Sequence, residues 1–347
     1  MTKAPLYHLA LRAMHTAHGA TFVEATGWTL PGSYGDPEAE HRAVREAAAV
    51  ADLSHHSQFI VSGTDAEVVL ARAFAGRVGE LDEGRALRTA ALTPDGTIAD
   101  LALIVRTGGI SYAVVGEPGQ RDTTAALLRA SREEDFDVRI EDRTETTCLV
   151  SVAGPAAQDL INRNLAEGLP ARLQTMHAVA FEFHGFRALA VRTSAVGEDG
   201  FLFMLAPAVA QHLIETLREA GLPLLGRIAS EALRVETCLP AFDPDLTGGL
   251  TPAEADVDLV FQIDGGRDTR ILSAVLFESQ SVPPSGSAAL HQGRAVGEVR
   301  SSVYSFGLRS AVGLAVLDRA IAVPGATLDV GGVRATMVTK PLHRRRA

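Results

Sequence analysis

The sequence predicts an α+β protein of several domains that ends in a small all-β domain. The chain has 347 residues, enough for two or three hydrophobic cores rather than one. An apolar strand followed by glycine and then a helix occurs twice, at Ile60 and at Val150. After Ala255 the pattern changes to short apolar runs between turn residues, which is typical of an all-β domain.

The N-terminal part alternates short helical and extended segments. Thr64 is expected to cap the helix that follows it, because its hydroxyl can accept from free backbone N–H groups. Thr93-Pro94-Asp95-Gly96 has the residue types of a hairpin turn between two strands. Residues 27–31 are expected to form a loop. Expected helices are 6–17, 37–50, 65–74 and 120–130, and expected strands are 20–25, 59–63, 86–92, 98–105 and 112–115.

From Thr146 the strand and helix pattern starts again. Helices are expected from Ala156, over 207–219 with proline in the first turn, and over 228–236. The expected strands are 148–153, 178–183, 188–193 and 201–205, then 297–304, 311–317, 327–330 and 333–338.

An acidic turn, Gly197-Glu198-Asp199-Gly200, lies between two of these strands. Glycine accepts backbone angles that other residues avoid, which favours a tight reversal here. Two acids at such a tip either face solvent or hold a ligand. The local pattern alone leaves both interpretations open.

Composition narrows the class of protein and its partners. The formal net charge is −10 and aromatic residues make up 5%, which argues against a nucleic-acid partner. No run of 18 apolar residues indicates a membrane span. Cys148 and Cys238 lack the spacing of a zinc or redox site, so no metal is expected, and the reducing cytoplasm is the predicted compartment.

Several segments, taken in order, resemble the glycine-cleavage T-protein (aminomethyltransferase) family over nearly the whole chain. The resemblance is carried by the following segments: Gly27-Trp28-Thr29-Leu30-Pro31, Glu40-His41-Arg42-Ala43-Val44-Arg45-Glu46, Asp52-Leu53-Ser54-His55, Leu92 to Asp100, Gly197 to Gly200, Ala232-Leu233-Arg234-Val235-Glu236, Thr251-Pro252-Ala253-Glu254-Ala255, and Gly297-Glu298-Val299-Arg300-Ser301.

The resemblance implies three domains arranged as a ring, with reduced folate (tetrahydrofolate) in a central channel. It implies residues 1–54 with 146–256 as a discontinuous folate-binding domain, 55–145 as a second domain, and 257–347 as a C-terminal β-barrel.

The resemblance also implies roles for individual side chains. Asp100 matches the catalytic aspartate, which manages a proton and stabilises positive charge. Glu198 matches the carboxylate that holds the pterin, and Arg234 matches an arginine near the folate path. From the residues alone, Asp100 could equally be a solvated strand residue. Arg234 could instead pair with Glu231, Glu236 or Glu198.

The sequence also departs from the family pattern, and the departures involve side chains expected along the channel. Arg88 and Phe242 stand where the family has tyrosine, Gly116 where it has asparagine, and His56 within a Ser-His-Met-Gly motif. Further departures are Ala195-Val196, Leu259 and Asp268-Thr269-Arg270-Ile271. Arg88, His56 and Phe242 are therefore expected in the ligand-binding site. Arg88 there would suit a carboxylate or phosphate, its alternative being an exposed salt bridge.

These features predict a tetrahydrofolate-dependent one-carbon transferase or demethylase that acts on an amine, ether or thioether. A lipoyl carrier protein would be the partner of an ordinary T-protein. Two alternatives are a folate-binding protein without catalysis and an enzyme that kept the scaffold but uses no folate.

Overall fold

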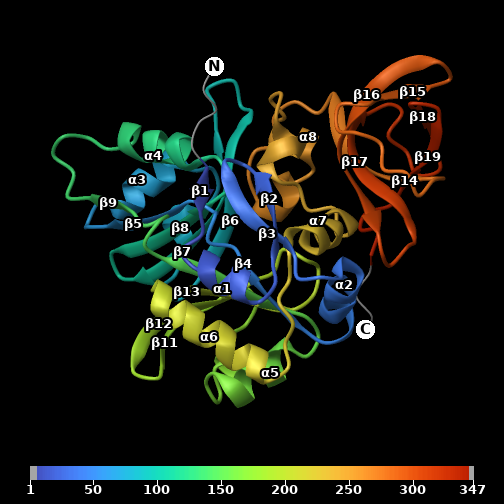
Figure 1. Cartoon of the computed structure of the whole chain (residues 1–347). Helices are drawn as coiled ribbons and strands as arrows, with labels where there is room; N and C mark the ends of the chain where they lie inside the picture. The colour runs from blue at the N-terminus through green and yellow to red at the C-terminus, as the bar shows by residue number, and fades with distance from the viewer. Residues whose placement is uncertain (1–5, 344–347) are drawn as a thin grey trace. The chain divides into compact units, whose positions relative to one another are not determined.

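The computed structural model describes residues 6–343, and it divides the chain into two compact units. The first unit takes the chain up to Ala91, then Asp100–Ser194 and Glu198–Ala229. The second takes Leu92–Ala99, Ala195–Gly197 and the chain from Ser230 onward. Figure 1 labels most of the helices and strands of both units. The division of residues 1–256 into two domains stays a prediction.

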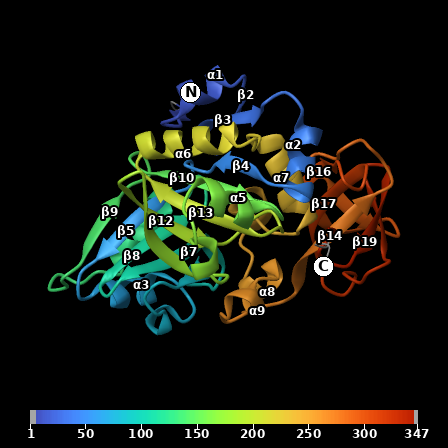
Figure 2. The same ribbon diagram turned by 90° about the horizontal axis from the view of Figure 1, so that it is seen from below.

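One sheet of the first unit has five antiparallel strands in the order β11-β12-β13-β10-β4. They are β4 (Ala49–Asp52), β10 (Cys148–Ala153), β11 (Ala178–Phe183), β12 (Phe186–Arg192) and β13 (Gly200–Leu205). Helix α6 (Pro207–Glu219) lies across one face, as Figure 2 shows, and α5 (Ala157–Asn164) packs beside it. Val209, Leu213 and Leu217 of α6 share a buried core with Phe201 and Phe203 of β13. Helix spacing thus turns one apolar face toward the sheet.

A second five-stranded sheet has the order β6-β7-β8-β5-β9. Its strands are β5 (Gln58–Ser62), β6 (Ala86–Leu92), β7 (Ile98–Gly108), β8 (Ser111–Gly116) and β9 (Arg139–Asp142). Helices α3 (Ala66–Ala73) and α4 (Arg121–Ala130) pack against one another, and α4 contacts β9. Asp65, not Thr64, is the residue before α3, and Thr64 instead donates to Asp137 (3.1 Å), so the predicted cap was wrong.

The N-terminal elements form a small sheet in the order β1-β3-β2, made of β1 (Tyr7–His8), β2 (Thr21–Ala25) and β3 (Trp28–Ser33). Helices α1 (Arg12–Ala17) and α2 (Pro37–Glu46) flank these strands in the sequence. A buried chain of hydrogen bonds ties them to β4. The Tyr34 hydroxyl contacts Nδ1 of His15 at 2.7 Å, and Nε2 of His15 contacts Asp52 at 2.9 Å. Because Nε2 donates to the carboxylate, Nδ1 accepts from Tyr34.

The helix predicted over 6–17 begins at Arg12, because Tyr7–His8 form β1 and pair with β3. Two further boundaries in this region differ from the sequence prediction. Residues 28–33 form strand β3, not a loop, because they pair with both β1 and β2. The predicted helix 37–50 ends at Glu46, and Ala49–Asp52 form β4, which pairs with β10. In both segments pairing with a distant strand outweighs the local preference of the sequence.

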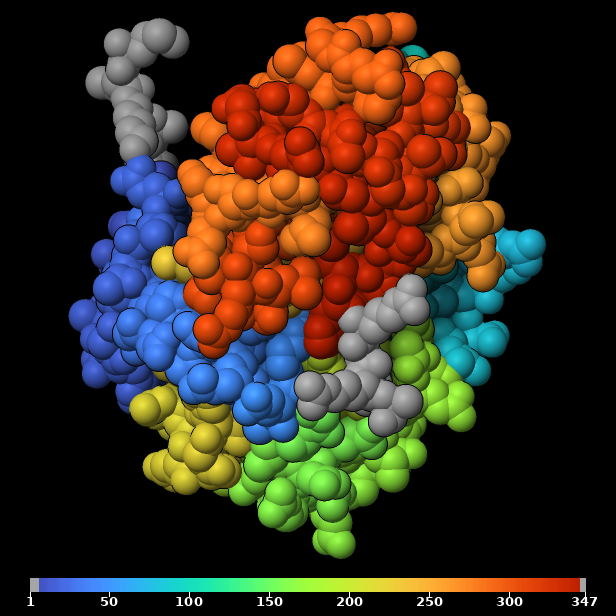
Figure 3. Space-filling model, turned by 90° about the vertical axis from the view of Figure 1, so that its right-hand side faces the viewer, coloured from blue at the N-terminus to red at the C-terminus, as the bar shows by residue number. Residues whose placement is uncertain are grey.

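The second unit ends in a closed barrel, in the order β14-β17-β16-β15-β18-β19. Its strands are β14 (Arg270–Phe277), β15 (Ala288–His291), β16 (Arg294–Ser305), β17 (Ser310–Asp318), β18 (Thr327–Val330) and β19 (Val333–Val338). In Figure 3 these strands, orange to red, form one continuous surface. The barrel confirms the predicted all-β C-terminal domain, and β18 and β19 have the predicted bounds. The sequence prediction missed β14 and β15.

The remaining elements are short. Helix α7 (Arg227–Glu236) crosses from the first unit into the second and is followed by a π-helical turn, Phe242–Leu246. Helices α8 (Pro252–Ala255) and α9 (Asp258–Phe261) precede the barrel, and two 3₁₀ turns cover Val78–Glu80 and Pro170–Arg172. Within residues 6–343 no helix has the length and apolar character to cross a membrane.

Candidate active site

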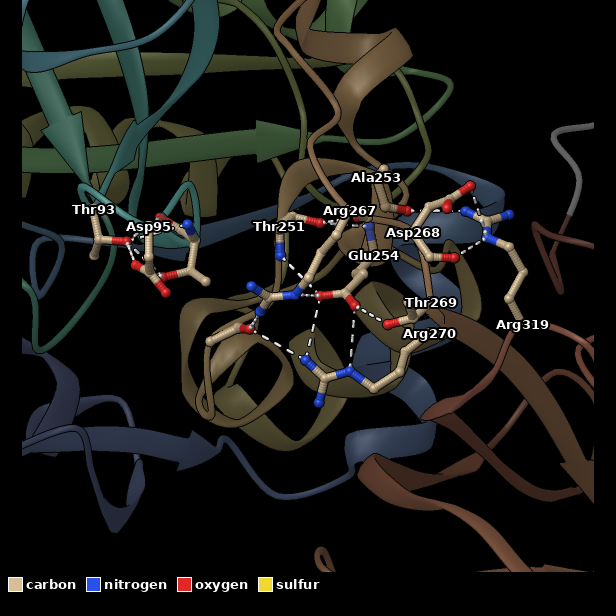
Figure 4. Close-up of polar contacts among 12 residues, drawn as sticks. Thr93, Asp95, Thr251, Ala253, Glu254, Arg267, Asp268, Thr269, Arg270 and Arg319 are labelled. Atoms are coloured by element: carbon tan, nitrogen blue, oxygen red, sulfur yellow. Dashed lines mark hydrogen bonds and ion pairs between the residues drawn. The ribbon is translucent and has the colours of Figure 1, made fainter.

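The predicted hairpin turn is present between β6 and β7. The Gly96 N–H donates to the Thr93 carbonyl at 2.9 Å, and Gly96 has a φ of +79°, which glycine adopts without strain. The Thr93 hydroxyl donates to the Asp95 carboxylate and accepts from the Thr97 N–H at 3.1 Å (Figure 4). The hydrogen bonds that its carboxylate accepts from the hydroxyls of Thr93 and Thr97 lower the pKa of Asp95. Two threonines and an exposed acid therefore rigidify the turn.

Asp100, near the start of β7, is fully buried, so it is not a solvated strand residue. Its carboxyl oxygens accept from the Glu117 N–H at 3.2 Å and from the Thr124 hydroxyl at 2.5 Å. Among the described residues no cation pairs with it. Burial raises the pKa of Asp100 well above its ordinary value, and the nearby charge of Glu117 raises it further, although the hydrogen bonds oppose this. A buried carboxyl group with a raised pKa is suited to accept or return a proton when a ligand is bound beside it.

Gly116, at the end of β8, leaves the space that this carboxyl group needs. A Cβ atom at Gly116 would lie 2.5 Å from Oγ of Ser57 and 2.6 Å from Oδ2 of Asp100, too close for any side chain. The Ser57 Oγ is buried and has no hydrogen-bond partner among the described residues. Glycine here therefore leaves room for both the Ser57 hydroxyl and the Asp100 carboxyl group.

His56 lies beside the same strand end. Its Nδ1 contacts the Gly116 carbonyl at 3.0 Å, and since a carbonyl only accepts, Nδ1 carries the proton. Burial lowers the pKa of His56, with Arg227 and Arg88 adding to the shift and Glu117 opposing it. His56 is therefore a neutral imidazole at neutral pH, with a lone pair on Nε2.

Arg88, on β6, is half-buried. Its Nη2 donates to the Thr193 hydroxyl at 2.9 Å and to the Ser194 carbonyl at 3.1 Å. Burial lowers the pKa of Arg88, while the charge of Glu117 opposes the shift. The predicted alternative of an exposed salt bridge is wrong, because neither hydrogen-bond partner is charged. Arg88, His56 and Asp100 thus all lie near Glu117, an acid that the sequence analysis missed.

The two acids of the turn at 197–200 are both held by arginines of the first unit. Glu198 is 8% exposed and accepts from Nη1 of Arg45 at 2.9 Å. Asp199 accepts from both Nε and Nη2 of Arg192, at 3.0 and 2.7 Å. The solvated interpretation of this turn was therefore wrong for Glu198. Arg45 was also missed as a site residue, although it belongs to one of the motifs that carry the family resemblance.

Arg234, on the part of α7 that belongs to the second unit, has an intramolecular partner for every N–H group. Nε donates to Glu231, Nη1 to the Leu239 carbonyl and Asp245 at 2.6 Å each, and Nη2 to Glu231 and Ser301 at 3.0 and 2.8 Å. A guanidinium has five N–H groups, so none is left for a ligand. Pairing with Glu231 is one of the alternatives left open by the sequence, whereas Asp245 and Ser301 were missed.

Phe242 is half-buried in the π-helical turn of the second unit. The structure therefore brings together Asp100, His56 and Arg88 in the first unit, with Glu198 in the turn between β12 and β13 of that unit's other large sheet. It places Arg234 and Phe242 in the second unit.

The buried carboxylate of Glu254 has a structural role in the second unit. It forms a capping box with Thr251 at the start of α8 and accepts from Thr269 at 3.0 Å. Arg267 and Arg270 each lie 3.3 Å from it (Figure 4). Burial would raise the pKa of Glu254, but hydrogen bonds from Arg270, the Thr251 N–H and Thr269 outweigh it, and the pKa is lowered. The departure at residues 268–271 thus supplies two partners of this carboxylate.

Known protein families and individual proteins match almost the whole chain. The model of the GCVT N-terminal domain matches residues 11–265, and that of the glycine cleavage T-protein C-terminal barrel domain matches residues 270–343. The aminomethyltransferases of Streptomyces avermitilis and Saccharopolyspora erythraea are 30% and 32% identical, each over 97% of this chain and 98% of their own length.

A solved structure also shares the fold. The glycine cleavage system aminomethyltransferase T from Bartonella henselae matches with a TM-score of 0.89 at 22% identity, over 98% of this chain and 99% of its own. These matches define an enzyme of the class that transfers one-carbon groups. The chain belongs to the glycine-cleavage T-protein family, the aminomethyltransferases.

Proposed function

We propose that this protein transfers a one-carbon unit between a small molecule and tetrahydrofolate, with Asp100 as the catalytic residue. The observation that carries the proposal is a fully buried carboxyl group that pairs with no cation within residues 6–343 and whose pKa is raised. Transfer of carbon between amines requires a group that accepts or returns a proton as the amine changes its bonding. Asp100 supplies such a group.

The residues of the first unit have the chemistry that a reduced folate requires. A pterin offers an amino group and a ring N–H side by side, and a carboxylate accepts from both. Glu198 is such a carboxylate, buried and oriented by Arg45. When bound, the folate would supply the nitrogen atoms that accept the carbon unit. Phe242 remains a proposed contact, whereas the hydrogen bonds of Arg234 favour a structural role for that residue.

The other residues near Asp100 act on its proton and orientation. The Glu117 N–H and the Thr124 hydroxyl hold one carboxyl oxygen each. Burial and the charge of Glu117 keep the carboxyl group protonated to a higher pH than a solvated aspartate. The unpartnered Ser57 hydroxyl is available to donate to a bound group or to Asp100 itself.

The departures along the predicted channel lead us to propose an amine, ether or thioether substrate other than the usual one. Ordinary glycine cleavage with a lipoyl carrier protein is the second candidate, favoured by the 30–32% identity to aminomethyltransferases. We also propose a cytoplasmic location, since Cys148 and Cys238 are free and buried, and burial raises the pKa of the Cys148 thiol to about 12.

The first test is a calorimetric titration with tetrahydrofolate. We expect binding to the parent protein, loss of binding in Glu198→Ala, and normal binding in Glu182→Ala, which removes an exposed acid on β11. Asp100→Asn should still bind folate but lose turnover by roughly 100-fold or more. Binding without any turnover in the parent would favour the non-catalytic alternative, and absence of binding would favour the folate-independent one. Activity with glycine and a lipoyl carrier protein would establish the second candidate.

A further inference from the structure

Arg88 retains hydrogen-bonding capacity that the protein does not use. Both of its hydrogen bonds come from Nη2 and end on neutral oxygens, those of Thr193 and Ser194. Within residues 6–343, nothing accepts from Nε or Nη1, which together carry three N–H groups. Neither atom is a buried orphan, so both are open to a solvent-borne group. A half-buried guanidinium that donates to no carboxylate among the described residues favours an anion from outside the chain.

The surrounding charges select the kind of anion. Glu117 lies close enough for its charge to act on Arg88, His56 and Asp100. A phosphate carries up to two negative charges and would be repelled by Glu117 at this short range. A carboxylate carries one charge, so Glu117 repels it less, and its oxygens can accept from the unused N–H groups of Nη1 or from Nε. The site therefore favours a carboxylate over a phosphate.

His56 adds a hydrogen-bond acceptor to the donors of Arg88. Its Nδ1–H is bound to the Gly116 carbonyl, so Nε2 presents a lone pair that no described residue uses. A ligand that places a carboxylate on Arg88 and an N–H group near His56 would satisfy both. Amino acids with a primary or secondary amine combine these two groups in a small molecule.

We propose that Arg88 binds the carboxylate of an amino-acid-like amine, which is the small-molecule substrate of the Asp100 site, with His56 accepting from its N–H group. This inference rests on the proposed function for the role of that amine as a one-carbon carrier. The carboxylate interaction itself does not depend on folate. The same chemistry could come from the glutamate part of tetrahydrofolate, and the test separates the two sources.

The experiment measures binding by calorimetry to four probes. N-methylglycine and N-methylethylamine differ in the presence of a carboxylate, and so do tetrahydrofolate and 6-methyltetrahydropterin. The proteins are the parent, Arg88→Gln, Arg88→Lys and Arg187→Gln, the last of which removes an exposed charge on β12. We expect the parent to bind N-methylglycine at least about tenfold more tightly than N-methylethylamine, and Arg88→Gln to abolish this preference. Arg187→Gln should retain it, and Arg88→Lys should retain part.

Each outcome decides the proposal. An effect of Arg88→Gln on tetrahydrofolate but not on 6-methyltetrahydropterin would support the carboxylate site and assign it to folate instead of the amine. Equal affinities of the parent for N-methylglycine and N-methylethylamine, with tetrahydrofolate binding unchanged in both Arg88 variants, would overturn it. If the parent binds N-methylglycine through Arg88 but does not bind tetrahydrofolate, the proposed function fails and the carboxylate site stands. The comparison of probes on the parent remains informative even if Arg88→Gln does not fold.

Discussion

The ion pair between Arg45 and Glu198 joins the stability of the first unit to its proposed ligand site. Its two side chains are 9% and 4% exposed, and Nη1 lies 2.9 Å from Oε1. Removing one partner of such a buried pair leaves a desolvated charge and costs about 3 kcal/mol or more. Removing both partners leaves no such charge. Arg45→Gln should therefore destabilise the protein far more than a surface substitution would.

The magnitude follows from a double-mutant cycle of Arg45→Gln, Glu198→Gln and the double variant. We expect a coupling energy of about 2 kcal/mol, with the double variant more stable than the sum of the single losses predicts. The matched control is Arg77 with Glu80, a pair 3.2 Å apart whose side chains are 66% and 68% exposed. An exposed pair of this kind contributes about 0.5 kcal/mol or less.

Urea unfolding followed by circular dichroism measures the free energy of unfolding of each variant. Tetrahydrofolate titrations of the same proteins should show weaker binding in Arg45→Gln, since Glu198 loses the group that orients it. Additive losses around the Arg45–Glu198 cycle, no larger in coupling than those of Arg77 and Glu80, would refute the reasoning.

Three further predictions concern single side chains. Because the folded-state pKa of Asp100 is raised, ionisation of this residue lowers the stability of the protein as the pH rises above the ordinary aspartate range. Asp100→Asn should therefore have a higher melting temperature than the parent at pH 8. The same difference in melting temperature at pH 3 would contradict this. Gly116→Ala should displace the Asp100 carboxyl group and abolish turnover, whereas Gly108→Ala, whose added Cβ would come no closer than 3.9 Å to a neighbour, should keep activity in the same assay. Tyr34→Phe leaves Nδ1 of buried His15 without its donor and should cost about 1–2 kcal/mol in urea unfolding, and an unchanged midpoint would show that the bond contributes nothing.

The sequence correctly predicted those elements whose local residue preferences favour the same structure as their packing in the folded protein. Helix α6 has the predicted bounds, because proline in its first turn and a regular apolar face both indicate a helix over these residues. Strand β3 was predicted as a loop, since Gly27 and Pro31 are turn residues, yet its backbone pairs on both sides. Such pairing depends on strands elsewhere in the chain, which local propensity does not contain.

In the site, too, the sequence predicted residues that belong to short motifs but not contacts between residues far apart in the chain. Asp100 and Glu198 were found because they belong to motifs that are short in sequence. The use of every Arg234 donor depends on Asp245, 11 residues away, and on Ser301, 67 residues away, and no local pattern relates them. Glu117 has no distinguishing signal beyond being an acid that follows a strand.

Strand β4 has consequences for the order in which the chain can fold during synthesis. Its neighbour in the sheet is β10, and the pairing of Asp52 with Val150 spans the whole of the second sheet. A ribosome that has released residues up to Asp142 has delivered every strand of that second sheet but no partner for β4. The inserted sheet can thus fold first, while β4 stays an unpaired edge until β10 emerges. Long-range pairing of this kind makes the first sheet the slower of the two to form.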